Sequence, residues 1–259
     1  IKTLEDRYLV GDEKSPQDAF ARAAIAFSDN EEHAQRLYDY ASKLWFMFST
    51  PVLSNGGTKR GLPISCFLNY VDDSMEGITE HNTDNAYLSS FGGGIGGSWS
   101  DIRASGTRTS KGSESTGVIP FVKVVDAEML AFSQGVTRRG SYAAYLHMSH
   151  PEVEEFLDMR KPTGGDTNRK CLNLHHGVVI PDKFMEIIHK ATKEPGFDDS
   201  WELIDPHSGE VKKVVSARTL WVKLLQNRME TGEPYFMFED AVKSLRGETK
   251  ISENNINDA

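Results

Sequence analysis

The sequence has few cysteines and no long apolar run. Its two cysteines, Cys66 and Cys171, are too few for a disulfide scaffold or a zinc cluster. A run of about 18 apolar residues is absent, which excludes a membrane span, and the first residues lack the apolar core of a secretory signal. We therefore expect a cytoplasmic protein that binds neither a metal ion nor a membrane.

An initiator methionine is also missing, so we expect the chain to begin inside a longer gene product. The net charge of −9 argues against binding to nucleic acid. Basic residues nevertheless gather in Gly-rich loops, which favours a phosphorylated small molecule, although a solvated surface charge is the simpler explanation for any single one. The two clusters are Arg103, Arg108, Lys111, Arg138 and Arg139, and Lys161, Arg169 and Lys170.

Helical and strand patterns alternate along the chain, which predicts the α/β class. Segment 15–18 has the serine, proline and aspartate that begin a helix, expected to end near Phe27. Asn30 is expected to cap a second helix, with an apolar stripe that extends through Leu44 and Trp45. Further helices are expected at about 74–90, 117–133 and 151–160, from 182 and from 216, and strands at 64–71, 142–148, 174–180 and 235–238.

Glycine, proline and polar residues mark the expected loops. The run Gly92–Gly97 matches the dinucleotide fingerprint G-x-G-x-x-G, but a helix precedes it in place of a strand, and no acidic residue closes a βαβ unit about 20 residues later. A phosphate cradle of backbone N–H groups and a flexible turn without ligand both stay open. Other loops are expected at 49–62, 98–115 and 161–170, a hairpin or surface insertion at 194–213, and an unstructured or cut-off end at 251–259.

Several residues have a simple structural explanation beside a functional one. Cys66 and Cys171 lie among apolar residues, where an inert core thiol is the usual outcome. His175 and His176 are adjacent in a strand, so their side chains point to opposite faces, and without a nearby carboxylate they do not form a metal site. Segment 72–74 can cap the next helix, and an acid there can also accept hydrogen bonds from a nucleotide sugar.

Ten short motifs follow one another between residues 48 and 169, within a similarity to one family that runs from about Leu4 to Asp240. They are 48–58, 63–68, 72–74, 93–96, 101–106, 116–121, 133–135, 138–140, 150–157 and 168–169. In order and spacing this series resembles the large (α, catalytic) subunit of class I ribonucleotide reductases, especially the compact phage and bacterial forms. The resemblance implies a ten-stranded α/β barrel made of two five-stranded parallel halves around a finger loop. Residues 1–48 would be an N-terminal helical region and residues 49–259 the first half of the barrel.

The same resemblance implies roles for individual residues. Cys66 resembles the first member of the cysteine pair that reduces the ribose at C2′. Residues 103–112 and 162–170 resemble the two loops that carry information from a bound effector to the substrate base. Thr50, Ser65, Gly93 and Gly94 would hold the substrate phosphates, Arg169 would contact the base, and Asp73, Ser74 and Arg103 would bind an effector, ATP or a deoxynucleoside triphosphate.

The activity implied is reduction of ribonucleoside diphosphates to deoxyribonucleoside diphosphates for DNA replication, by thiyl-radical chemistry. No cofactor would be bound directly by this chain. The radical would come from a di-metal small (β) subunit, thioredoxin or glutaredoxin would restore the thiols, and two α subunits could form a dimer. An ATP-binding cone, which precedes this point in longer relatives, is absent or lies outside the chain.

Departures from the family pattern limit this expectation. The radical cysteine of an Asn-x-Cys-x-Glu motif, the second reducing cysteine and the second half of the barrel are not in the sequence. We therefore expect the isolated chain to be inactive, as a truncation or one piece of a split gene. Three alternatives stay open: an adenosylcobalamin-dependent (class II) reductase, a nucleotide-binding regulatory module without catalysis, and a dinucleotide-dependent oxidoreductase, which rests only on the glycine run.

Overall fold

The computed structural model describes residues 2–132 and 140–245. The chain divides into two compact units. The first contains Ile1–Phe67, Ala86–Ile95 and Phe132–Ser141, and the second contains Leu68–Asn85, Gly96–Ala131 and Tyr142–Ala259. The basic turn predicted around Arg138 and Arg139, like the chain end after 250, lies outside the described residues.

Four helices of the first unit surround a small apolar core. They are α1 (Lys2–Tyr8), α2 (Pro16–Ala26), α3 (Glu31–Ser42) and α4 (Thr50–Asn55). The buried side chains of this core are Ala19, Phe20, Ala23, Ala41 and Leu53. Helix α4 corrects the prediction of a continuous loop over 49–62. A proline in its first turn has the backbone angle of a helix start, and Leu53 gains a place in the core.

The predicted starts of α2 and α3 are confirmed. The Asp18 carboxylate accepts hydrogen bonds from the backbone N–H of Lys14 at 2.9 Å and of Ser15 at 3.0 Å. Asn30 Oδ1 accepts a hydrogen bond from the backbone N–H of residue 33 at 2.9 Å. The predicted continuation of the α3 stripe is wrong. Leu44 has a φ of 57°, which lies in the left-handed region, so it does not continue the right-handed α-helix, and its side chain is exposed.

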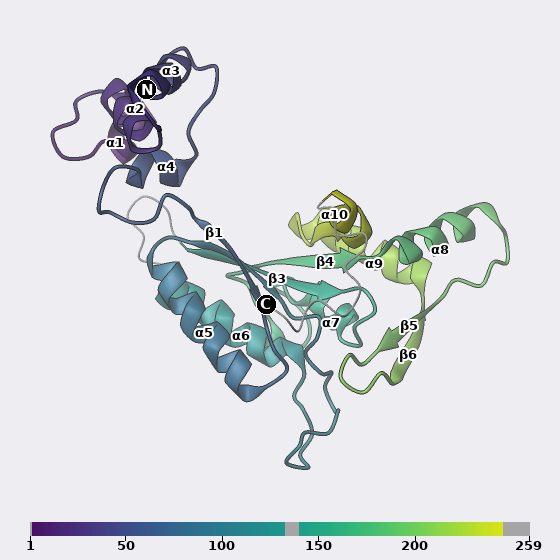
Figure 1. Cartoon of the computed structure of the whole chain (residues 1–259). Coiled ribbons are helices and arrows are strands. Elements are labelled where there is room, and N and C mark those ends of the chain that lie inside the picture. The colour runs from purple at the N-terminus through teal and green to yellow at the C-terminus, as the bar shows by residue number, and fades with distance from the viewer. Residues whose placement is uncertain (1, 133–139, 246–259) are drawn as a thin grey trace. The chain divides into compact units, whose positions relative to one another are not determined.

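A five-stranded sheet organises the rest of the fold, in the order β1-β2-β3-β4-β7 (Figure 1). The strands are β1 (Cys66–Tyr70), β2 (Gly94–Ser98), β3 (Ser141–His147), β4 (His175–Ile180) and β7 (Tyr235–Phe238). Strands β3, β4 and β7 are parallel, with Ala143 opposite His175 and Gly177 opposite Tyr235. The predicted fold class is confirmed: the chain is α/β, with the parallel sheet of a first barrel half after N-terminal helices.

The glycine run is strand, not loop, from Gly94 onward. The reason is close packing against β3. A methyl group on Gly97 would collide with the hydroxyl group of Tyr142, which accepts a hydrogen bond from Trp99 Nε1 at 2.9 Å and lies 2.9 Å from His81 Nε2. Only a residue without a side chain leaves room for this buried tyrosine.

Helices of the second part of the sequence follow the predicted pattern with two corrections. They are α5 (Met75–Ser90), α6 (Val118–Ala131), α7 (Val153–Asp158), α8 (Asp182–Lys193), α9 (Ala217–Thr231) and α10 (Glu239–Leu245). Helix α10 was not predicted, because the stretch after Asp240 is only polar in sequence. Two acidic residues in its first turn favour a helix start. The sequence predicts one apolar face of α9 from Leu220, Trp221, Leu224, Leu225 and Met229. Leu220 and Leu224 are buried, as this face requires, whereas Leu225 and Met229 are exposed.

A separate antiparallel hairpin lies between α8 and α9, in the segment where a hairpin or surface insertion was predicted (Figure 1). It consists of β5 (Ser200–Ile204) and β6 (Val211–Ser216). Trp201 packs edge-on against Phe184 of α8, with the ring centroids 5.1 Å apart. Ser216 Oγ accepts a hydrogen bond from the N–H of Thr219 at 3.1 Å, which confirms the predicted cap of α9. Among the described helices, none combines the length and hydropathy of a membrane span.

Candidate functional site

The two cysteines lie in opposite environments. Cys66 is the first residue of β1 and is exposed, with a free thiol. The interpretation of Cys66 as an inert core residue is therefore wrong, because the strand it begins has one solvent-facing side. Cys171 is fully buried, as the core interpretation predicted, and burial raises the pKa of its thiol to about 12.

This difference predicts selective alkylation. Iodoacetamide near pH 8 is expected to modify Cys66 in the folded chain and to leave Cys171 intact, because the buried thiol is both inaccessible and protonated. Peptide mass spectrometry measures the two sites separately. In denaturant both cysteines should react, and a Cys66→Ser variant should take up no label when folded. Equal labelling of both residues in the folded chain would contradict the assignment.

The residues predicted to hold substrate phosphates belong to the same unit as Cys66. Gly94 N–H donates to the Ser65 carbonyl oxygen at 2.6 Å, which brings these two residues together. Gly93 N–H donates to the Leu88 carbonyl oxygen at 2.9 Å. Thr50, on α4, lies 3.2 Å from the hydroxyl oxygen of Tyr8. Both glycine N–H groups thus donate to backbone carbonyls here, and contact with a phosphate would require an exchange of those bonds.

Asp73 and Arg103, both predicted at the effector site, form a close ion pair. Arg103 Nε lies 2.8 Å and 3.1 Å from the two carboxylate oxygens of Asp73, and both side chains are largely buried. Arg103 Nη1 also donates to the carbonyl oxygen of Arg108 at 3.2 Å. Ser74 Oγ accepts a hydrogen bond from Gly77 N–H at 2.9 Å, so Ser74 contacts the start of α5. The structure therefore brings Asp73 and Arg103 together, with Ser74 next in the chain.

The predicted first loop, 103–112, has the backbone bonds of a narrow hairpin. Gly106 N–H donates to the Ser115 carbonyl oxygen at 2.9 Å, and Ser115 N–H donates to the Thr107 carbonyl oxygen at 2.8 Å. Arg108 and Lys111, two of its basic residues, are exposed near the tip. Positive charge is therefore presented to solvent from a loop whose base is ordered by its own hydrogen bonds.

The β5–β6 turn supplies two residues that the sequence did not indicate. Asp205, fully buried, accepts hydrogen bonds from Ala104 N–H at 2.7 Å and Thr107 Oγ1 at 2.8 Å. Burial alone would raise the pKa of Asp205, but these bonds and two from Ser208 outweigh it and hold the pKa at about 2. His207 Nδ1 lies 3.2 Å from Asp73 Oδ2. No local pattern could reveal them, because about a hundred residues of sequence separate the partners.

The predicted second loop, 162–170, contains a short 3-10 helix, Thr167–Arg169. Arg169, the predicted base contact, is bound to two carboxylates of the α7 region. Its Nη2 lies 2.6 Å from Glu155 Oε2 and 3.1 Å from Glu152 Oε1, and its Nε also donates to Glu155. These hydrogen bonds from Arg169 to Glu155 raise the pKa of the guanidinium.

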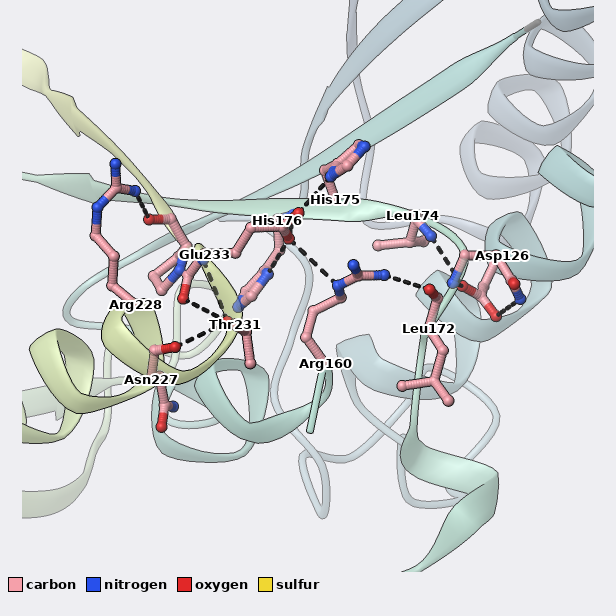
Figure 2. Close-up of polar contacts among 12 residues, drawn as sticks. Asp126, Arg160, Leu172, Leu174, His175, His176, Asn227, Arg228, Thr231 and Glu233 are labelled. Atoms are coloured by element: carbon pink, nitrogen blue, oxygen red, sulfur yellow. Dashed lines mark hydrogen bonds and ion pairs between the residues drawn. The ribbon is translucent and has the colours of Figure 1, made fainter. Parts of the chain in front are cut away.

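Figure 2 shows a polar cluster around Glu233, into which His175, His176 and Arg160 converge. The Glu233 carboxylate contacts Nδ1 of both histidines, at 3.1 Å for His176, and Arg160 Nε at 3.3 Å. Burial alone would raise the pKa of Glu233, but the histidine hydrogen bonds and the arginine charge hold it at about 2. The expectation that these histidines lack a nearby carboxylate is wrong, because Glu233 comes from the distant turn before β7.

Comparisons with known proteins agree with this architecture. Residues 64–257 match the family model of the ribonucleotide reductase barrel domain, and residues 1–61 match the model of the ribonucleotide reductase all-alpha domain. The fold thus defines a parallel α/β barrel half preceded by helices. The chain belongs to the ribonucleotide reductase large-subunit family.

The chain spans between 24% and 40% of the length of three relatives that it matches. It is 46% identical to the ribonucleoside-diphosphate reductase large subunit of Invertebrate iridescent virus 6, covering 93% of this chain and 24% of the relative. It is 32% identical to subunit alpha of Helicobacter pylori strain J99, covering 93% of this chain and 34% of that subunit. The structure of the Actinobacillus ureae class Id ribonucleotide reductase alpha subunit matches with a TM-score of 0.69 and 28% identity, over 93% of this chain and 40% of that one.

Proposed function

We propose that this chain is the substrate- and effector-binding part of a class I ribonucleotide reductase large subunit, which reduces ribonucleoside diphosphates. The observation that carries the proposal is the position of Cys66. It is the exposed one of the two cysteines, and it begins the first strand of the parallel sheet. A thiol that donates electrons to a substrate has to be reachable from solvent.

Cys66 would act as one of two reducing thiols. After a thiyl radical removes the hydrogen atom from C3′, the 2′-hydroxyl group leaves as water. The two thiols together supply two electrons and two protons: one proton leaves with the 2′-hydroxyl group as water, the other proton and the two electrons reduce C2′, the thiols join as a disulfide, and the hydrogen atom returns to C3′. Thioredoxin or glutaredoxin reduces the disulfide, and the starting radical is supplied by the di-metal centre of a small (β) subunit. Hydroxyl groups of Thr50 and Ser65 would bind the diphosphate.

Residues from the rest of the barrel would complete the site. Strand β1 alternates in burial, so Cys66, Leu68 and Tyr70 lie on its exposed side. Leu68 is 84% exposed and Tyr70 is 61% exposed, an apolar surface that solvent does not favour. We infer that the second half of the barrel, with its radical cysteine, covers this side. The chain alone should then show no turnover.

The effector site would form around Asp73 and Arg103. A nucleoside triphosphate has phosphate oxygens for the Arg103 guanidinium and ribose hydroxyl groups for the Asp73 carboxylate, and Ser74 follows directly. The exposed Arg108 and Lys111 would add positive charge for the triphosphate. Binding of ATP or a deoxynucleoside triphosphate would exchange the present ion pair for contacts with the ligand. Two such chains could assemble as a dimer.

Effector binding by the chain is the direct test. Equilibrium dialysis with dTTP or ATP is expected to detect binding, and Arg103→Gln should weaken it about tenfold, which corresponds to about 1.4 kcal/mol. The matched control is Arg36→Gln, which replaces an exposed arginine on α3 and should bind the nucleotide as the wild type does. Unchanged affinity in Arg103→Gln would show that the effector site lies elsewhere.

Activity tests separate the alternatives. Adding the remaining barrel half and a radical-generating subunit should give turnover, whereas a requirement for adenosylcobalamin would assign the cobalamin-dependent class. Nucleotide binding with no turnover in either assembly would instead identify a regulatory module.

A further inference from the structure

Glu152 occupies a central position between the two predicted loops. It immediately precedes α7, and its side chain is buried, with 8% of the residue surface exposed. One carboxylate oxygen, Oε2, accepts hydrogen bonds from Val118 N–H at 2.9 Å and Ser105 N–H at 3.3 Å. The other oxygen, Oε1, lies 3.1 Å from Arg169 Nη2. A single carboxylate therefore joins both ends of the segment 105–118 to the loop 162–170.

The backbone at Gly117 leaves room for the Glu152 carboxylate. Gly117 has a φ of 81°, a conformation that favours glycine, and a methyl group there would collide with the Glu152 carboxylate. The neighbouring carboxylates do not share this position. Glu155 contacts Arg169, and Glu154 Oε2 contacts Lys213 on β6. Within the described part of the chain, Glu152 is the one of these three glutamates that bonds to both segments.

We infer that Glu152 is a positioning residue that couples the segment 105–118 to the loop 162–170 by holding Arg169. This inference rests on the proposed function, since it assigns to Glu152 the transfer of effector binding at one loop to the substrate-facing loop. A movement of the Ser105 and Val118 N–H groups changes the strength of the hydrogen bond between the Glu152 carboxylate and Arg169.

The energetics favour such coupling. Burial raises the pKa of Glu152, and the Val118 N–H and the Arg169 charge oppose that effect. A buried carboxylate needs its partners, so loss of the Arg169 charge makes the buried position of Glu152 less favourable and weakens its hydrogen bonds to the N–H groups of Ser105 and Val118. Coupling between sites is reciprocal, which means that changes at Arg169 must also reach Ser105 and Val118.

Hydrogen exchange with mass spectrometry tests this without any ligand. The Arg169→Gln variant is expected to raise amide exchange at Ser105 and Val118 by about tenfold, although it contacts neither residue. In the Arg169–Glu152 ion pair Arg169 is the more exposed residue, so the Arg169→Gln variant should keep the fold. In a Glu152→Gln background the same substitution should have no further effect. Glu154→Gln, the matched control on the adjacent glutamate, should leave both segments unchanged.

Either of two results would overturn the inference: no change at Ser105 and Val118 in Arg169→Gln, or an equal change with and without Glu152. A second arm adds dTTP. Protection of 105–118 in all variants, but of 162–170 only where Glu152 is intact, is expected. If dTTP protects neither segment in any variant, the proposed effector site fails, while the ligand-free comparison still decides the role of Glu152.

Discussion

Replacement of Cys66 by serine is expected to abolish ribonucleotide reduction by an assembled large subunit that contains this chain. The loss should be at least about 1,000-fold, equivalent to about 4 kcal/mol in the activation barrier. A serine hydroxyl group has the size and position of the thiol but cannot give up electrons to form a disulfide. Because Cys66 is exposed at a strand end, its replacement should not disturb the core.

The measurement is deoxyribonucleotide formation by the wild-type, Cys66→Ser and Cys171→Ala subunits, each with the same small subunit and thiol reductant. Cys171→Ala is the control, because Cys171 is buried and its loss should lower stability by about 1 kcal/mol without touching the substrate. Effector binding should be normal in all three proteins. Turnover by Cys66→Ser at a rate near that of the wild type would remove Cys66 from the chemistry.

Replacement of Asp205 by alanine is expected to lower the stability of the second unit. It leaves Ala104 N–H and the Thr107 hydroxyl group buried without their acceptor, which should cost about 3 kcal/mol. Loop 103–112 would also lose its anchor, so effector affinity should fall together with stability. Urea denaturation and dTTP dialysis measure the two effects.

The lowered pKa of Asp205 also predicts how the stability difference between the wild type and Asp205→Ala depends on pH. Its pKa is about 2 in the folded protein and 3.8 is its ordinary value, so its contribution is complete above pH 3.8 and is lost as the pH falls through 2. The gap between the wild type and Asp205→Ala should therefore narrow by about 2 kcal/mol on acidification. The control is Asp198→Ala, which replaces an exposed aspartate beside the same hairpin that bonds Ser200, and it should change stability little. A pH-independent gap would contradict the depressed pKa.

Local signals account for the parts of the fold that the sequence predicted. Capping residues such as Asn30 and Ser216 lie next to the helices they begin, and apolar runs mark β3, β4 and β7. Strand β2 escaped prediction because the need for glycine at Gly97 comes from the bulk of Tyr142, a residue far along the chain. Helix α4 escaped because its buried Leu53 is a tertiary contact.

The candidate site was likewise predicted only in part from the sequence. The motif series brought Asp73 and Arg103 into one prediction, and the structure places them in contact. It gave no indication of Asp205, His207 or Glu152 as partners of the loops, since hydrogen bonds across such long separations leave no periodic trace in a sequence. The roles of these residues in binding stay predictions.

The anchoring of loop 103–112 by the β5–β6 turn has a consequence for the order of assembly during synthesis. Ala104 lies 101 residues before Asp205, so the loop leaves the ribosome long before its anchor exists. Contacts of such separation form late, because a long chain segment has to close first. A nascent chain that already contains the strands β1 to β4 would thus hold this loop by Asp73 and Glu152 but not by Asp205, and the loop would reach its final form only once the hairpin has been made.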